Sequence, residues 1–275
     1  MLPLPLIHLA SYLLALVRFR GYGPQPVTPA SLNRWLSQLD RTQRRDVLSL
    51  LRHVVYLSQR DTEACLVNLN QGLQAHLSLS GISPPSTLYV QMHDPASSSA
   101  VMLSILRDKG HLEKAGAQLV HWKDTRGLNE MTQRIGQGAI VYVDDFAGTG
   151  RQFVTVRNNL VDFVVGPFAE FFLLPVICEE AFHRVSRLGV EVVASLVHAK
   201  AQRPLLPFSR SISSSRRDRL LLMSRQIDQS GGLGFGGLAS MVVFYRNAPN
   251  TTPVLLRGSP RDAFFGLFPR TSDIQ

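Results

Sequence analysis

The chain has 275 residues, of which 45% are hydrophobic and 18% are charged. This composition excludes a largely disordered chain and supplies enough apolar surface for one large domain or two small ones. The net charge of +9 favours a polyanionic partner such as nucleic acid, a phosphorylated ligand or an acidic protein, although a basic protein with scattered arginines is an equally good interpretation.

The chain opens with an apolar run over residues 2–17. Arg18 and Arg20 follow this run instead of preceding it, and the run is short for a membrane span. We therefore expect an N-terminal helix packed on the domain and no stable membrane insertion, with a weak membrane contact as the alternative. The two cysteines form no CxxC pair, which argues against a zinc site or a disulfide framework and favours a cytoplasmic protein with free thiols.

Apolar residues at helical spacing continue over residues 28–79, beginning at a Thr-Pro pair that is typical of a helix start. The breaker cluster GISPPS at residues 81–86 then marks the predicted boundary between an N-terminal helical unit (1–80) and an α/β domain (81–275). Beyond it, apolar runs alternate with helical patterns, which predicts a parallel sheet flanked by helices. We expect strands at 87–92, 117–121, 139–143, 171–176 and 190–197, and helices around 101–107 and 180–188.

The sequence GAIVYVDDFAGTGRQF at residues 138–153 contains the main candidate ligand-binding residues. A buried strand of a parallel sheet reads as a continuous apolar run, and here that run ends in two acids, Asp144 and Asp145. A turn of small residues follows, whose backbone N–H groups suit a phosphate. Acids for sugar hydroxyls or a metal beside a phosphate cradle indicate a sugar-phosphate or nucleotide site; the alternative is a capped strand-to-helix turn.

The stretch DDFAGTG resembles the phosphoribosyl-pyrophosphate motif of type I phosphoribosyltransferases, with Asp144, Asp145, Thr149 and Gly150 in matching places. The resemblance implies a type I phosphoribosyltransferase-like α/β fold, in which Asp144 and Asp145 hold the ribose hydroxyls. It also implies a phosphate-binding loop after them. The expected phosphate and ribose contacts are Asp144, Asp145, Phe146, Ala147, Gly148, Thr149, Gly150, Arg151 and Gln152.

The tail is similar to one branch of this family, the phosphoribosyltransferase-like proteins associated with bacterial conflict, or antiphage defence, elements. The similarity lies in GLGFGGLASMVVFYRNAPNTTPVLLRG (232–258), in AFFGLFPR (263–270), and in the helical stretch around NRWLSQLD (33–40). It implies an effector that acts on nucleotides or nucleic acid, and nucleic acid or a partner protein of a defence system as a further binding partner.

Two further segments correspond to loops of the family. The loop after the first core strand, residues 93–99, would bind pyrophosphate through Asp94, Ala96, Ser97, Ser98 and Ser99, with Asp94 as a candidate Mg²⁺ ligand; the alternative is a Ser-capped helix start. The mobile basic loop of the family falls between residues 107 and 126. Among its cations, Lys123 and Arg126 are the candidate catalytic residues, and ordinary surface charge is the alternative.

These features give two competing functions. The first is an enzyme that binds phosphoribosyl pyrophosphate or a related nucleotide with Mg²⁺ and transfers the phosphoribosyl group. The second is a catalytically inactive nucleotide-sensing or nucleic-acid-associated subunit, since a fold alone does not determine function. The acceptor substrate, and whether the protein is a homo-oligomer, stay open at this point.

Overall fold

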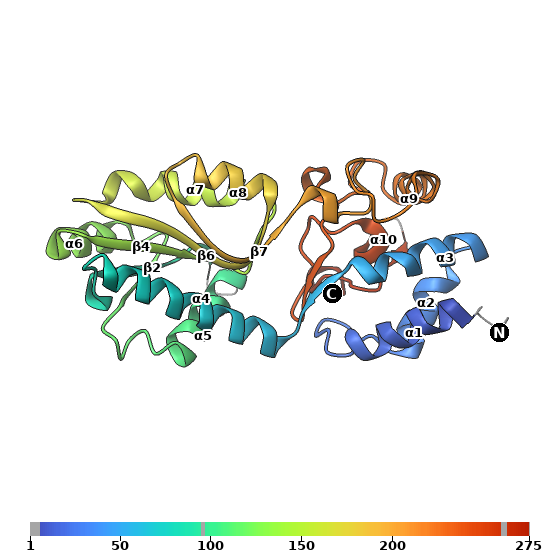
Figure 1. Ribbon diagram of the computed structural model, residues 1–275, viewed down its shortest axis with the longest axis horizontal. Helices are drawn as coiled ribbons and strands as arrows, with labels where there is room; N and C mark the ends of the chain where they lie inside the picture. Colours follow the sequence, from blue (N-terminus) through green and yellow to red (C-terminus); the bar gives the residue numbers. More distant parts are fainter. Residues whose placement is uncertain (1–5, 95–96, 260–262, 275) are drawn as a thin grey trace. The chain divides into compact units, whose positions relative to one another are not determined.

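The computed structural model describes residues 6–94, 97–259 and 263–274. The chain forms two compact units (Figure 1): unit 1 combines residues 1–61 with 199–275, and unit 2 comprises residues 62–198. This division differs from the predicted domain boundary at residue 80. The long helix α4 (Gln59–Leu79) contributes to the core of unit 2, and the C-terminal tail folds with the N-terminal helices.

Unit 2 is built on a parallel sheet, which confirms the predicted α/β class. The order is β3-β2-β4-β6, with β7 on the other edge of β6 and the short β5 pairing with β6 beyond the end of β4. The strands are β2 Thr87–Gln91, β3 Gln118–His121, β4 Gly138–Val143, β5 Phe146–Ala147, β6 Phe168–Cys178 and β7 Glu191–His198. All five predicted strands are present, and because they run parallel their carboxyl ends lie at one edge.

Helices cover both faces of this sheet (Figure 1). Successive side chains of a strand point to opposite faces: Ile140 and Tyr142 of β4 join one core cluster, and Val141 and Val143 join the other. The first cluster is completed by α6 (Thr125–Ile135), α7 (Arg151–Leu160) and α8 (Glu179–Ser186), and the second by α4 and α5 (Ser98–Lys109). Burial on both faces explains why these strands read as unbroken apolar runs.

Unit 1 is mainly helical and has its own core around the fully buried Trp35, whose indole N–H donates to the Leu255 carbonyl at 2.8 Å. Thr28 caps α2 through a hydrogen bond from the Ser31 amide, as the Thr-Pro pair predicts. The elements are α1 Leu6–Arg18, α2 Pro29–Ser37, α3 Arg41–Leu50, β1 Val55–Leu57, α9 Ser214–Ile227, β8 Val242–Phe244, α10 Val254–Arg257, β9 Gly258–Ser259, β10 Phe264–Phe265 and α11 Thr271–Ile274.

A short parallel ribbon joins the two chain segments of unit 1, because β1 pairs with β8 in the register Val55 to Val242. The prediction of an all-helical stretch over 28–79 was therefore wrong at β1, whose partner lies far along the chain. Five 3₁₀ turns complete the described elements: η1 Leu51–His53, η2 Pro84–Ser86, η3 Val161–Phe163, η4 Lys200–Gln202 and η5 Phe235–Gly237. Among the helices in the described ranges, none combines the length and the apolar character that crossing a bilayer requires.

Candidate functional site

The two acids of the motif lie directly after β4, at the carboxyl edge of the sheet. The Asp144 amide still donates to the Leu173 carbonyl of β6 at 3.2 Å, so the strand pairing extends to the first acid. Its side chain is buried, and Oδ1 accepts hydrogen bonds from the Asp145 amide at 2.9 Å and from the Ser98 hydroxyl at 3.1 Å. Asp144 is therefore held in one orientation, whereas Asp145 is only half-buried.

The loop from Phe146 to Gly150 carries the chain from the acids into α7. Ala147 pairs with Ile177 of β6, which fixes the start of the loop to the sheet. Gly150 has φ +71°, and a Cβ at this position would lie 3.2 Å from the Ala181 Cα, so the close approach requires glycine. The Thr149 hydroxyl accepts from the Arg151 amide at 3.4 Å. Backbone amides at the start of a ten-residue helix therefore follow the acids, as the motif predicts.

The predicted pyrophosphate loop leads into α5, and its three serines play different parts. Ser97 caps α5 by accepting from the Ala100 amide, and Ser98 reaches Asp144. Ser99 is fully buried: its hydroxyl accepts from the Met92 amide at 2.8 Å and donates to the Val143 carbonyl at 2.7 Å. Ser99 thus joins the ends of β2 and β4 rather than facing a ligand. Ala96 lies outside the described residues.

The structure separates the two predicted cations of the basic segment. Lys123 lies at the site, because its ammonium donates to Asp94 Oδ1 at 2.7 Å, and this interaction lowers the pKa of the Asp94 carboxyl. Arg126 is instead highly exposed and pairs with Glu130 one turn further along α6. The segment from 107 to 126 also contains β3, so it is not one continuous loop.

His93 is the site residue that the sequence analysis missed. Its Nε2 lies 3.4 Å from Asp144 Oδ2, a close contact without hydrogen-bond geometry. Burial lowers the pKa of His93, but the adjacent Asp144 carboxylate, with the charges of Asp145 and Asp94, outweighs burial, and the net effect is a raised pKa. The linear sequence gave no sign of this contact, because the loop with His93 and the loop with Asp144 and Asp145 come together only in the folded sheet.

A partly buried ion pair links α7 to β6. Arg157 of α7 donates through Nε and Nη2 to Glu170 of β6 at 2.8 and 2.6 Å, and the Tyr142 hydroxyl donates to the same carboxylate at 3.0 Å. Burial and the neighbouring Glu170 charge raise the pKa of Tyr142 far above its usual range. The bidentate pair therefore fixes the helix that begins with the candidate phosphate loop.

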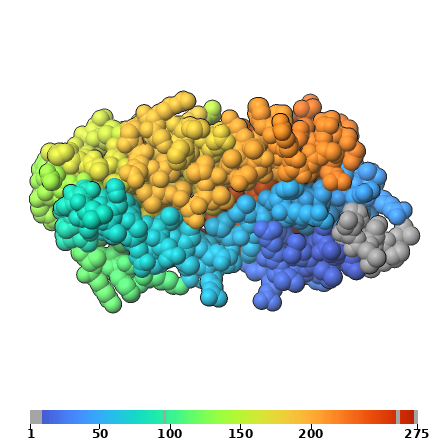
Figure 2. All heavy atoms as spheres, viewed as in Figure 1, coloured from blue at the N-terminus to red at the C-terminus, as the bar shows by residue number. Residues whose placement is uncertain are grey.

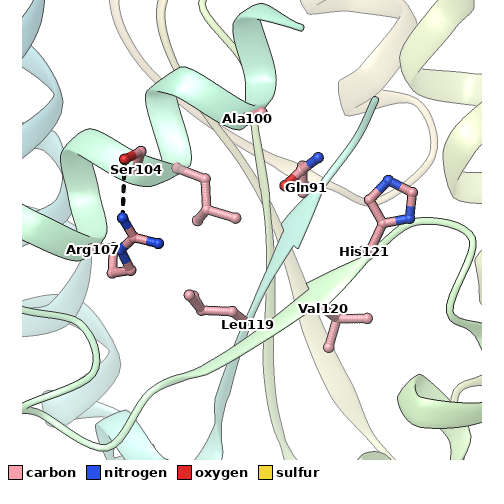
Figure 3. A pocket seen from close by; sticks show the side chains of 8 residues that line it. Gln91, Ala100, Ser104, Arg107, Leu119, Val120 and His121 are labelled. Carbon is pink, nitrogen blue, oxygen red and sulfur yellow. Dashed lines mark hydrogen bonds between the residues drawn. The ribbon is translucent and has the colours of Figure 1, made fainter. Parts of the chain in front are cut away.

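A pocket of about 160 Å³ opens beside the candidate site, between α5, β2 and β3 (Figure 3). Gln91 and His121, the last residues of β2 and β3, lie at one side of it, and Arg107 and Ser104 of α5 lie at the other. The Gln91 side chain also donates through Nε2 to the His93 carbonyl at 2.7 Å, so the pocket and the pyrophosphate loop share Gln91 as a common boundary.

The residues of the site suit a metal ion that is shared with the phosphates of a ligand better than an ion that protein side chains enclose. Within the described ranges, no cluster of three or more His, Cys, Asp or Glu side chains could enclose an ion. Mg²⁺ is usually held by one or two carboxylates together with substrate phosphates and water. The exposed carboxylate of Asp94, beside Lys123, has the chemistry for such a shared ion.

Comparison with known proteins identifies the family of the chain. The sequence profile of the PRTase-CE family matches residues 32–270. Among solved structures, the orotate phosphoribosyltransferase from Aeropyrum pernix is similar, with 18% identity and a TM-score of 0.30 over 46% of this chain and 66% of that enzyme. The chain thus spans slightly less than two thirds of the length of that protein, and no curated protein matches the sequence. The chain belongs to the PRTase-CE family and has a phosphoribosyltransferase-like fold.

Proposed function

We propose that the carboxyl edge of the sheet in unit 2 binds phosphoribosyl pyrophosphate, or a related nucleotide, together with Mg²⁺. The observation that carries this proposal is the fixed orientation of Asp144. It is buried at the end of β4, held by the Ser98 hydroxyl and the Asp145 amide, and followed directly by the glycine turn into α7. Carboxylates that can bind sugar hydroxyls thus lie next to backbone amides that can bind a phosphate.

Each group has a defined part in the proposed complex. Asp144 and Asp145 accept hydrogen bonds from the ribose hydroxyls, and the loop over residues 147–152 binds the 5′-phosphate through backbone N–H groups. The pyrophosphate lies toward Asp94 and Lys123, where the Lys123 ammonium offsets its negative charge. Mg²⁺ shared between Asp94 and the pyrophosphate oxygens would neutralise more of this charge.

The reaction that this arrangement would serve is phosphoribosyl transfer. The bond between the ribose C1 and the pyrophosphate oxygen breaks, the oxygen keeps the electron pair, and an acceptor nucleophile forms the new bond to C1. The residues of the chain would orient the sugar and stabilise the leaving pyrophosphate by position and charge, without a covalent intermediate.

Calorimetric titration with phosphoribosyl pyrophosphate tests the binding step. We expect binding that requires Mg²⁺ and is lost in the double variant Asp144→Asn, Asp145→Asn. Arg126→Gln is the matched control, since Arg126 pairs with Glu130 outside the site, and it should bind as wild type. A double variant that binds as tightly as wild type would disprove the assignment. Mg²⁺-dependent binding of phosphoribosyl pyrophosphate that releases no pyrophosphate in the presence of any acceptor tested would favour a sensor over an enzyme.

We further propose that the protein acts as an effector in bacterial defence, on the basis of the tail motifs at 232–258 and 263–270. A plaque assay tests this role in cells that express the complete locus. Expression of the wild-type chain should lower the plating efficiency of phage, and the Asp144→Asn, Asp145→Asn variant should restore it. Equal protection by the variant would separate any defence role from the nucleotide site.

A further inference from the structure

Helix α1 exposes an unusual surface for a helix on a folded unit. Among its described side chains, those that face solvent are Leu9, Ala10, Leu13, Leu14 and Val17. At 3.6 residues per turn they cover a continuous arc of about 140° without a polar residue. The exposed fraction reaches 52% for Leu13 and 71% for Val17, so most of the surface of Val17 and about half of that of Leu13 face solvent. Figure 2 shows the dark-blue atoms of α1 at the surface.

The opposite side of α1 is already occupied, which fixes the orientation of the helix. Ala15 is fully buried in the core of unit 1, and the Ser11 hydroxyl is contacted by Arg52 at 3.5 Å. Arg18 donates to the Val54 carbonyl at 2.5 Å. The helix therefore cannot turn its apolar arc inward without losing these contacts, and the arc is available to an outside partner.

Positive charge borders this arc on one side and at its C-terminal end. Arg18 and Arg52 lie along one side of it, Arg20 follows the end of the helix, and the first 39 residues contain no acid. The charge of the whole chain is also concentrated here. Unit 1 has 19 Lys and Arg against 7 Asp and Glu, a net charge of +12, whereas unit 2 has 10 against 13, a net charge of −3.

Arg216, Arg217 and Arg219 form the densest arginine cluster of the sequence, but they do not offer an equivalent surface for nucleic acid. On α9, Arg216 and Arg219 both pair with the buried carboxylate of Asp46, at 3.1 and 2.7 Å. Arg217 donates to the Pro204 and Ser209 carbonyls. These side chains have partners within unit 1, so the distinctive free surface is the apolar arc with its basic border.

We propose that α1 binds an anionic phospholipid surface, with its apolar arc entering the boundary between head groups and acyl chains. An apolar face combined with flanking arginines is the pattern of helices that lie in the membrane interface, and the 13 residues of α1 are too few to cross a bilayer. The arginines add attraction to anionic lipids. Unit 1 would thus hold the protein, with the nucleotide site proposed above for unit 2, at a membrane surface.

Co-sedimentation with vesicles tests this proposal, using phosphatidylcholine alone and phosphatidylcholine mixed with phosphatidylserine. The full chain should bind the anionic vesicles more tightly. Leu13→Ser with Val17→Ser should weaken binding on the order of 100-fold, because two apolar side chains no longer enter the interface. Leu222→Ser with Phe208→Ser removes two other exposed apolar side chains of unit 1 and should bind as wild type.

A second variant measures the electrostatic contribution to vesicle binding. Arg20→Gln should weaken binding about fivefold on anionic vesicles and leave binding to neutral vesicles unchanged. The proposal is overturned if wild type fails to sediment with vesicles, or if Leu13→Ser with Val17→Ser binds as wild type. It is also overturned if light scattering shows a dimer that Leu13→Ser with Val17→Ser dissociates, since the apolar arc would then be a dimer interface. Binding of an oligonucleotide without binding of vesicles would overturn it as well.

Discussion

Ser99 is a small residue on which the geometry of the candidate site depends. Its buried hydroxyl accepts from the Met92 amide at 2.8 Å, just after β2, and donates to the Val143 carbonyl at 2.7 Å, at the end of β4. Both backbone groups belong to fully buried residues. Ser99→Ala removes one oxygen atom and leaves the shape of α5 intact, so it isolates the effect of these two hydrogen bonds.

The expected cost follows from the two partners that lose the hydroxyl. A buried N–H left without an acceptor costs about 1–3 kcal/mol, and a lost hydrogen bond to a carbonyl costs about 0.5–1.5 kcal/mol. Ser99→Ala should therefore lower the free energy of unfolding of unit 2 by about 2–4 kcal/mol. Ser98→Ala, whose hydroxyl reaches Asp144 at a partly exposed position, should change this free energy by less than about 1 kcal/mol.

Native-state hydrogen exchange of amides in β2 and β4 measures this cost within unit 2, independently of unfolding in unit 1. We expect faster exchange in Ser99→Ala at these strands and weaker binding of phosphoribosyl pyrophosphate, because the ends of β2 and β4 separate. Ser98→Ala should weaken binding while leaving exchange nearly unchanged. Exchange in Ser99→Ala within about 0.5 kcal/mol of wild type would refute the reasoning, since the hydroxyl would then not satisfy these groups.

Three further predictions concern the surroundings of the site and the core of unit 1. Glu170→Gln removes the charge that Arg157 contacts through two hydrogen bonds, and should lower stability by about 2–3 kcal/mol in urea unfolding. Gly150→Ala should cost about 1–2 kcal/mol and weaken ligand binding, whereas Gly189→Ala, at a similar positive φ in open space, should cost stability alone. Burial raises the pKa of Tyr56 to about 12. The native state therefore keeps a proton that the unfolded state loses near pH 10, so stability should fall between pH 10 and 12, and less steeply in Tyr56→Phe.

The sheet and the acidic motif could be predicted because their signals are local. Strands buried on both faces are continuous apolar runs, and β4 leads directly into Asp144, Asp145 and the glycine turn. The helix α6 was not predicted, although Asp124 caps it by accepting from the Gly127 amide. Its apolar residues Leu128, Met131 and Ile135 recur at i, i+3 and i+7, so the sequence does contain the signal of an amphipathic helix there.

The contacts between loops could not be predicted, because they depend on which strands are neighbours. His93 follows β2 and Asp144 follows β4, and they meet only because β2 pairs with β4. The Lys123–Asp94 pair likewise requires β3 to lie beside β2. The sequence analysis placed both cations of the basic segment at the site on equal terms. The pairing of β3 with β2 brings Lys123 to Asp94, whereas the i,i+4 spacing on α6 pairs Arg126 with Glu130.

The distribution of charge changes how phosphate recognition must work in this chain. A net charge of +9 suggests a general attraction to anions, yet the unit that contains Asp144 has a net charge of −3. A highly charged ligand bound there must be held by local groups: the backbone amides at the start of α7, Lys123, and an ion brought with the pyrophosphate. Binding of phosphoribosyl pyrophosphate should therefore depend strongly on Mg²⁺ and weakly on added salt, whereas attraction of unit 1 to an anionic surface should fall steeply with salt. A steep salt dependence of nucleotide binding in the presence of saturating Mg²⁺ would contradict local recognition and indicate that the field of unit 1 contributes.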